Sequence, residues 1–282
     1  MEKQLITNEL LLAFSEYLQS NERAPGTIEK YLRDVSAFRI WLGNRSVTKE
    51  LTAEWKERLL ENNHAPVTVN SMLAAVNSFF RFAGWEDCQV KFLKLQRRLF
   101  RDAGRELTKS DYQSLLDAAC RLGRERLGLL VETIGATGIR VSEVRYITVE
   151  AVRQGKAEVS LKGKIRVILL PGKLCRKLLK YAQKQKTASG AIFRTKSGKE
   201  LGRRQIWAEM KCICKTAGVD SLKVFPHNLR HLFATVYYRI YKDIVKLADI
   251  LGNSSVEPTR IYLLSPGTEH RRRKLERLRL VL

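Results

Sequence analysis

Residues 225–240, FPHNLRHLFATVYYRI, predict a single helix, and the organisation of the chain can be worked out from it. Pro226 suits the first helical position, because proline has a preset φ and the N–H that it lacks would have no partner within the helix. His227 and Arg230 are three residues apart, so their side chains lie on one face of the first turn. The start of this helix therefore presents a histidine and an arginine together.

The segments before this helix predict further helices and one hairpin. Residues 107–119 place Thr108 and Asp111 at the spacing of a capping box, and residues 124–138 predict a helix that ends at Gly138. Residues 154–171, QGKAEVSLKGKIRVILLP, are rich in β-branched residues on both sides of Gly163 and predict a short β-hairpin. Together these segments predict a mainly α-helical domain with a small β-sheet.

Residues 1–95 predict a separate helical domain. Two of its helical segments begin alike, with Ala-Pro-Gly-Thr at 24–27 and Ala-Pro-Val-Thr at 65–68. We expect Thr27 and Thr68 to cap these helices. Residues 96–106 are basic and predict a linker, so that a second domain spans 107–282.

The charge of the chain indicates a polyanionic partner. Its 282 residues include 52 Lys and Arg against 29 Asp and Glu, a formal net charge of +23. Such a field attracts nucleic acid, and the basic residues are spread over the whole length rather than gathered in a tail. No apolar run is long enough to predict a membrane span, so we expect no membrane partner.

Neither the cysteines nor the histidines predict a metal site. The five cysteines are scattered and odd in number, which favours reduced thiols in a cytosol. His227 and His231 have the spacing of a zinc-binding helix, but Asn228 stands where that motif requires glutamate. We expect no metal and no cofactor.

Several cationic side chains could converge on one phosphate. Arg140 follows the glycine-bearing turn GATG, and Lys162 and Lys164 flank Gly163 in the predicted hairpin. The planar guanidinium of arginine binds two phosphate oxygens at once. A phosphodiester under attack gains negative charge in the transition state, and preplaced cations stabilise that charge.

Four sequence blocks together resemble the tyrosine recombinase (phage integrase) family. They are ATGIRVSEV at 136–144, LKGKIR at 161–166, HNLRHLFAT at 227–235 and LADILGNSSVEPTRIY at 247–262. The resemblance covers nearly the whole chain. It implies an N-terminal helical core-binding (SAM-like) domain over 1–95 and a mixed, mostly α-helical catalytic domain with a small β-sheet over 107–282. In that family the two form a C-shaped clamp on DNA.

The resemblance also implies the site residues. Arg140 and Arg230 resemble the arginines that bind the scissile phosphate, and Glu143 matches the acidic residue that supports the first of them. Lys162 resembles the hairpin lysine that protonates the leaving 5′ oxygen, with Lys164 as the alternative. His227 resembles the histidine of the H-x-x-R pair. Tyr262 resembles the nucleophile that forms a 3′-phosphotyrosine.

One position departs from the family pattern. Asn253 follows Leu-Gly where the family has histidine or, in some members, tryptophan. The amide of asparagine can donate a hydrogen bond to a phosphate oxygen, but it cannot act as a charged acid. We therefore expect Asn253 to keep the phosphate contact and to give weaker support to the transition state.

The implied function is site-specific DNA recombination by a small Xer-like or transposon-type enzyme. The implied partners are double-stranded DNA with an inverted-repeat site and three further copies of the chain in a tetramer. The resemblance implies that the C-terminal tail helix is exchanged between protomers, and packing of the tail onto its own domain is the alternative. A bacterial-type cytoplasmic, nucleoid-associated location follows from this task. Two alternatives remain open at this point: a type IB topoisomerase-like enzyme that relaxes DNA, and a non-catalytic DNA-binding protein with the same fold.

Overall fold

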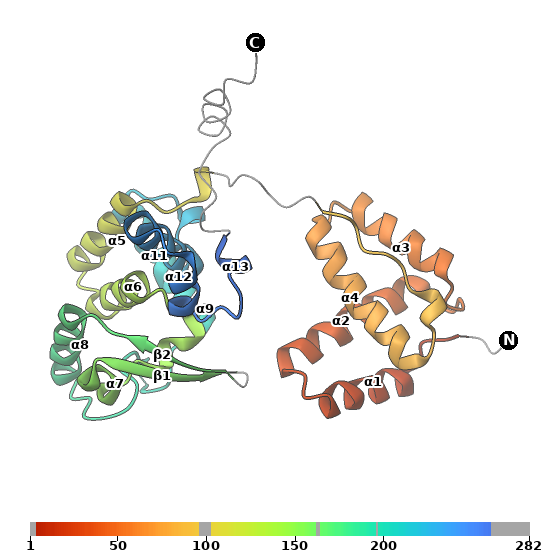
Figure 1. Cartoon of the computed structure of the whole chain (residues 1–282), viewed down its shortest axis with the longest axis horizontal. Helices are drawn as coiled ribbons and strands as arrows, with labels where there is room; N and C mark the ends of the chain where they lie inside the picture. The colour runs from red at the N-terminus through yellow and green to blue at the C-terminus, as the bar shows by residue number, and fades with distance from the viewer. Residues whose placement is uncertain (1–3, 96–102, 162–163, 196, 261–282) are drawn as a thin grey trace, which may run out of the picture. The chain divides into compact units, whose positions relative to one another are not determined.

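The computed structural model describes residues 4–95, 103–161, 164–195 and 197–260. Contacts within the chain divide it into two compact units, Met1–Arg97 and Arg98–Leu282 (Figure 1). No helix in the described ranges is long and apolar enough to cross a membrane. The roles given to residues 1–95, 96–106 and 107–282, and the C-shaped clamp, stay predictions.

The described part of the first unit is a bundle of helices around an aromatic core. Phe14 and Phe79 are fully buried, and their rings meet edge to face at 5.3 Å. Buried aromatic pairs of this geometry add to the energy of area burial. The elements are α1 (Asn8–Ser20), α2 (Pro25–Leu42), α3 (Lys49–Glu61), α4 (Pro66–Ala83) and the 3-10 helix η1 (Glu86–Cys88).

The starts of α2 and α4 correct two predicted caps. Both helices begin at a proline, and Ala24 and Ala65 occupy the cap positions. Thr27 and Thr68 lie inside the first turn, where their backbone N–H groups donate to those alanine carbonyls at 2.7 Å. The prediction was wrong because proline at the first position already sets φ and removes one unpaired N–H, so each helix starts three residues earlier than predicted.

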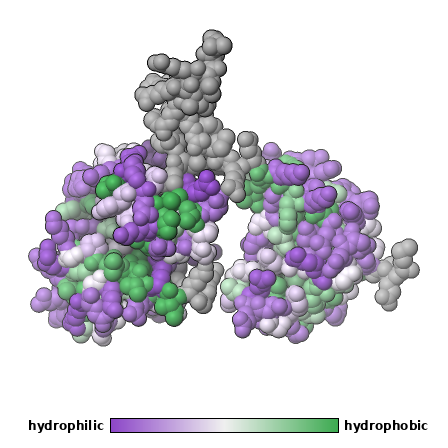
Figure 2. Space-filling view, in the orientation of Figure 1, coloured by the Kyte–Doolittle hydropathy of each residue, from purple (hydrophilic) through white to green (hydrophobic). Residues whose placement is uncertain are grey.

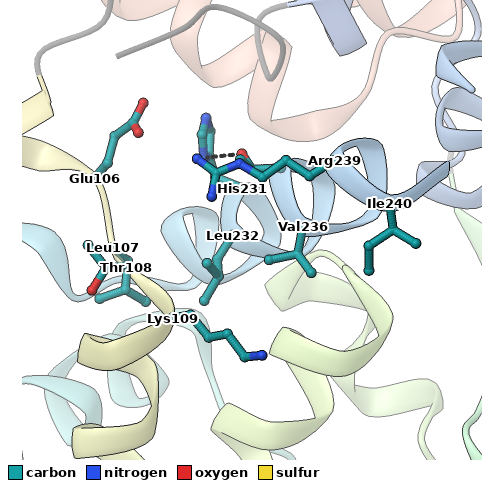
Figure 3. A pocket seen from close by; sticks show the side chains of 10 residues that line it. Glu106, Leu107, Thr108, Lys109, His231, Leu232, Val236, Arg239 and Ile240 are labelled. Carbon is teal, nitrogen blue, oxygen red and sulfur yellow. Dashed lines mark hydrogen bonds between the residues drawn. The ribbon is translucent and has the colours of Figure 1, made fainter. Parts of the chain in front are cut away.

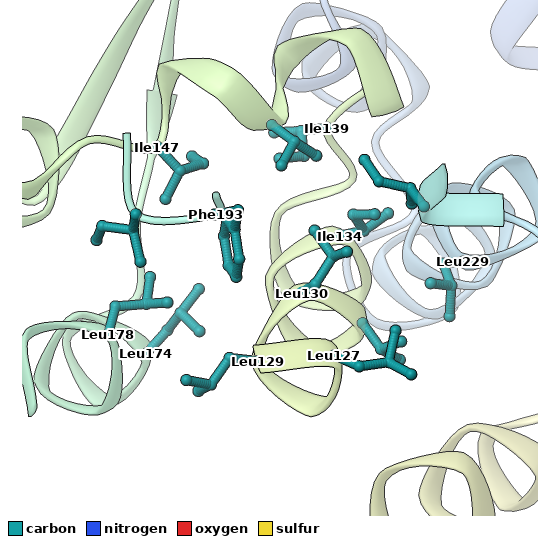
Figure 4. Packing of buried hydrophobic residues seen from close by; sticks show 14 of the residues in the cluster. Leu127, Leu129, Leu130, Ile134, Ile139, Ile147, Leu174, Leu178, Phe193 and Leu229 are labelled. Atoms are coloured by element: carbon teal, nitrogen blue, oxygen red, sulfur yellow. The ribbon is translucent and has the colours of Figure 1, made fainter. Parts of the chain in front are cut away.

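The second unit packs around the apolar helix α6 (Glu125–Thr137). Figure 4 shows Leu178 and Phe193 on one side of α6 and Leu229 on the other. Because α6 is covered on several sides, it buries residues all round its surface, Leu130 and Ile134 completely. The other α-helices are α5 (Lys109–Arg121), α7 (Val149–Gln154), α8 (Gly172–Lys184), α9 (Arg203–Cys212), α10 (Cys214–Ala217), α11 (Pro226–Tyr241), α12 (Ile244–Leu251) and α13 (Glu257–Arg260). The 3-10 helices are η2 (Ala103–Arg105), η3 (Val141–Tyr146) and η4 (Ser221–Lys223).

The predicted hairpin is present as strands β1 (Lys156–Leu161) and β2 (Lys164–Leu169), which pair antiparallel. Its inner face buries Val159 and Ile168 against the core. The outer face of β2 is apolar and exposed, and Figure 2 shows hydrophobic residues on the part of the surface where Figure 1 places the hairpin. The mostly helical fold with a small sheet is confirmed.

Three local signals in the sequence predict helix ends in the second unit. Thr108 and Asp111 form the capping box that starts α5. Gly138, with φ +65°, ends α6 in the left-handed conformation that glycine adopts without strain. Pro226 opens α11. These predictions are confirmed. The end of α6 and the start of α11 determine the backbone positions of Arg140 and Arg230.

Candidate functional site

A polar cavity of about 360 Å³ lies in the second unit, at the ends of several elements. The end of α6, the start of η3, the first turns of α9 and α11 and the turn after α12 meet around it. Its lining residues are Ile139, Arg140, Val141, Ser142, Arg203, Pro226, His227, Arg230 and Asn253.

Arg140 reaches the cavity because the chain turns sharply after α6. Its Nη1 donates to Oε1 of Glu143 at 3.0 Å, and its Nη2 donates to Oδ1 of Asn253 at 3.1 Å and to the carbonyl of Gly252 at 3.2 Å. The Arg140 side chain is still 41% exposed. It is therefore held in place while part of its guanidinium faces the cavity.

Glu143 is a buried carboxylate shared by two arginines. Only 2% of its side chain is exposed. It accepts from the backbone N–H of Arg140 at 2.7 Å and from Nη2 of Arg166 at 2.6 Å, in addition to the Arg140 guanidinium. A buried charge is tolerated when it is paired and fully hydrogen-bonded. Glu143 is thus placed to orient arginines.

Arg166 connects the β1–β2 hairpin to Glu143. It lies on the inner face of β2, and its Nη1 donates to the carbonyl of Ile250 at 2.9 Å. Burial lowers the pKa of the Arg166 guanidinium from its ordinary value, and the nearby Glu143 carboxylate opposes that shift. An arginine stays protonated under such conditions, so Arg166 contributes a fixed positive charge.

Arg230 lines the cavity and is largely buried. Its Nη1 donates to the carbonyl of Gly138 at 2.7 Å, and its Nη2 donates to the carbonyl of Leu251 at 2.7 Å and to Oδ1 of Asn253 at 3.4 Å. The helical position of Arg230, one turn into α11, aims its side chain at the ends of α6 and α12.

The ends of α6 and α12 hold the arginines without cancelling their charge. The last carbonyls of a helix carry partial negative charge and lack helical partners. The carbonyls of Gly138, Ile250, Leu251 and Gly252 accept from arginine side chains here. Two of the three arginines that make these bonds, Arg140 and Arg166, pair with the Glu143 carboxylate. The cluster of three arginines and one glutamate therefore has a formal charge of +2. It is suited to bind an anion.

His227 and Arg203 complete the lining. His227 is exposed in the first turn of α11, and Arg203 is the exposed first residue of α9. Both side chains can carry positive charge at the mouth of the cavity, and the N-terminal turns of their helices bring backbone N–H groups to the same place.

The structure therefore gathers five of the predicted residues: Arg140, Glu143, His227, Arg230 and Asn253. Lys162 and Tyr262 lie outside the described residues, and the side chain of Lys164 lies outside them as well. The catalytic roles of all these residues stay predictions.

Arg166 and Arg203 were not predicted from the sequence as site residues. Arg166 stands two residues after Lys164 and shares the inner face of β2 with buried Ile168. A charged residue on the buried face of a predicted strand indicates a partner, and this period-2 pattern is the signal that could have found it. Arg203 has no comparable local signal, because its part in the site depends on how α9 packs beside η3.

Gly252 allows the Arg166 side chain to approach the backbone closely. It has φ +62°, and a Cβ there would lie 2.4 Å from Cδ of Arg166. Gly155 is a matched control, because it has φ +71° and open space around it. We expect Gly155→Ala to cost about 1–2 kcal/mol of unfolding free energy from backbone strain alone. Gly252→Ala should cost about 1–3 kcal/mol more, because Arg166 must move.

Thermal or urea unfolding of both variants measures the difference. Equal losses in the two variants would contradict the proposed packing of Arg166 against the turn after α12.

Two family models match the chain. The one described as "Phage integrase family" matches residues 105–266, and the one described as "Phage integrase, N-terminal SAM-like domain" matches residues 11–87. Together they cover most of both units. The first alone covers more than half of the 282 residues.

The chain is also similar to individual proteins along most of its length. It is 27% identical over 281 residues to tyrosine recombinase XerA of Thermococcus kodakarensis, covering 97% of this chain and 96% of that protein. The structure matches a lambda integrase tetramer bound to a Holliday junction, with a TM-score of 0.74, 18% identity and coverage of 90% of this chain and 76% of that one. It matches a transposon integrase in complex with transposon right-end DNA, with a TM-score of 0.70, 16% identity and coverage of 95% and 99%.

Proposed function

The chain belongs to the phage integrase family of tyrosine recombinases, and from this premise we propose that it is a site-specific DNA recombinase. It cuts and rejoins DNA strands through a 3′-phosphotyrosine intermediate. The observation that carries the proposal is the pair of guanidinium groups, Arg140 and Arg230, that converge on one Asn253 oxygen at the wall of a polar cavity.

In the first step the phenolic oxygen of Tyr262 attacks the phosphorus of a DNA phosphodiester. The phenol gives up its proton, to His227 or to water, as the new oxygen–phosphorus bond forms. The bond to the 5′ oxygen breaks, and Lys162, or Lys164 in its place, gives that oxygen a proton. A phenol is a weak nucleophile at neutral pH because its pKa is about 10. Positive charge around the site favours the phenolate and so lowers the barrier.

In the second step the 5′ hydroxyl of a partner strand attacks the phosphotyrosine and releases Tyr262. The phosphotyrosine is a diester like the bond that it replaces, so rejoining needs no external energy source. Arg140, Arg230 and His227 bind the non-bridging oxygens, on which charge accumulates in both steps. Asn253 adds no ionisable group at the position where other family members have a histidine.

The implied partner is duplex DNA with an inverted-repeat recombination site. The net charge of +23 supports a large phosphate interface. The solved relative that is a tetramer on a Holliday junction supports assembly of four protomers on two synapsed sites. We place this activity in the cytoplasm, on the nucleoid, as part of a small Xer-like or mobile-element system.

A groove beside α11 supports exchange of the C-terminal tail between protomers. The groove has a volume of about 520 Å³, and Leu232, Val236 and Ile240 of α11 line it beside Leu107 and Lys109 from the start of α5 (Figure 3). The tail, TEHRRRKLERLRLVL at 268–282, carries leucines with helical spacing that match an apolar groove. We propose that the tail of one protomer occupies the groove of the next.

Deletion of residues 269–282 should then abolish strand exchange, because assembly fails, while single protomers still bind DNA. Ile240→Asp should act in the same direction, since Ile240 lines the groove and its exposure should make the change compatible with folding. Leu122→Asp, at an exposed leucine away from the groove, is the matched control and should recombine normally. Gel-shift titration separates binding from assembly, and full strand exchange by the truncated chain would contradict the proposal.

The function itself is tested with a DNA site selected from a random duplex library by retention on the protein. A duplex with a nick beside the cleavage position traps the intermediate. Cleavage then releases a short fragment that carries the 5′ hydroxyl, and this fragment diffuses away before it can rejoin. We expect a denaturation-resistant protein–DNA adduct and, with two intact sites, exchanged strands. Relaxation of supercoiled DNA without exchange would indicate a topoisomerase, and binding without an adduct would indicate a non-catalytic protein.

A further inference from the structure

Asn253 joins the arginine cluster to the segment that leads to Tyr262. Its Oδ1 accepts from Arg140 at 3.1 Å and from Arg230 at 3.4 Å. Its Nδ2 donates to Oγ1 of Thr259 at 2.9 Å. One carboxamide therefore contacts both arginines on one side and a residue of α13 on the other.

The orientation of this amide follows from the chemistry of its neighbours. A guanidinium has donors and no acceptor, so the oxygen of Asn253 must face the arginines. Its NH₂ group must then face Thr259, whose hydroxyl can accept. Rotation of the amide by half a turn would place donors against donors at two contacts. Arg140 and Arg230 therefore fix the orientation of the Asn253 amide.

Thr259 is built into the protein interior. It is fully buried, and its backbone N–H donates to the carbonyl of Val256 at 2.9 Å in the turn that starts α13. A buried hydroxyl is costly to leave without a hydrogen bond, so the contact with Asn253 contributes to holding α13 beside the turn after α12. Three peptide steps separate Thr259 from Tyr262, and they span at most about 11 Å.

We propose that Thr259 is a positioning residue for Tyr262. Through Asn253, its hydroxyl fixes the start of the tyrosine-bearing segment against the same two guanidinium groups that bind the phosphate. The asparagine that departs from the family pattern thus acts as a link between phosphate binding and nucleophile placement. This inference rests on the proposed function, and neither Asn253 nor Thr259 exchanges a proton in it.

The test compares Thr259→Val with Thr259→Ser in single-turnover adduct formation on the nicked duplex. Valine keeps the shape of threonine and removes the hydroxyl, so we expect about a tenfold slower rate, while DNA affinity stays at the wild-type value. Serine keeps the hydroxyl and should restore the rate. Thr133→Val is the matched control, because Thr133 is also fully buried with a bonded hydroxyl, on α6 away from the cavity.

Two further measurements separate positioning from a general loss of structure. In an Asn253→Ala background the link is already broken, so adding Thr259→Val should slow the reaction no further. In a Tyr262→Phe background, hydrogen peroxide can replace the tyrosine: its oxygen attacks phosphorus and the 5′ oxygen leaves with a proton. That cleavage uses the arginines without the tyrosine, so Thr259→Val should not change its rate.

The outcomes are distinct. If the unaltered chain forms the adduct and the Thr259→Val variant forms it at the same rate, only the positioning role is overturned. An additive loss in the Asn253→Ala background, or an equal loss in peroxide cleavage, overturns it as well, because the defect then lies outside the link. Absence of an adduct with the unaltered chain overturns the proposed function, and this inference falls with it.

Discussion

Tyr262→Phe should remove all detectable covalent adduct on the nicked duplex, while the affinity for the same DNA should be unchanged. Phenylalanine keeps the ring and loses only the oxygen that attacks phosphorus. Without that oxygen no other group of the protein forms the phosphotyrosine bond, so the loss is complete rather than partial. Denaturing gel electrophoresis of labelled DNA measures the adduct, and a gel shift measures the affinity.

Tyr237→Phe is the control for this experiment. Tyr237 lies on α11 and packs against Phe233, with ring centroids 6.1 Å apart. Its hydroxyl has no part in the proposed reaction, so adduct formation should proceed as in the unaltered chain. An adduct formed by the Tyr262→Phe protein would show that another side chain is the nucleophile.

Arg140→Ala should lower the single-turnover rate of adduct formation by roughly 10²–10³-fold. The reason is the loss of a fixed donor at a phosphate oxygen whose charge grows in the transition state. Arg140 is a cleaner target than Arg230, because Glu143 keeps its ion pair with Arg166 at 2.6 Å when Arg140 is removed. The Arg230 side chain is buried, and its removal leaves two carbonyls without a donor.

Arg153→Ala is the matched control, at an exposed arginine in the last turn of α7. It changes the net charge by the same amount and should leave the rate unchanged. The melting temperatures of both variants show whether folding is affected. Cleavage by the Arg140→Ala protein at the wild-type rate would contradict its role at the phosphate.

The sequence predicted those parts of the fold that depend on local chemistry. Thr108 with Asp111, Gly138 and Pro226 mark helix ends because capping, left-handed φ and a missing N–H act within a few residues. Thr27 was wrongly predicted as a cap because two local signals compete there, and proline prevails. The apolar pattern likewise predicted a mostly helical chain with one hairpin.

The connections within the candidate site depend on tertiary packing and could not be predicted in this way. The resemblance to a family supplied Arg140 and Arg230 as a pair, but not the carbonyls that hold them. Arg166 and Thr259 have partners far away in sequence or on another element, such as Glu143 and Asn253. No spacing rule links such residues, because their meeting depends on how α12 ends beside β2 and α11.

The arginine anchors are main-chain oxygens at Gly138, Ile250, Leu251 and Gly252. A point mutation replaces a side chain and leaves the carbonyl in place. The geometry of the anion site is therefore kept by any substitution that leaves the backbone path unchanged. Gly138 and Gly252 are the exceptions among these supports, because both have positive φ and a Cβ at either would crowd its neighbours. A laboratory programme that retargets this protein to new DNA can diversify base-contacting residues freely, whereas an insertion or deletion within the turn after α12 would disable every retargeted variant alike.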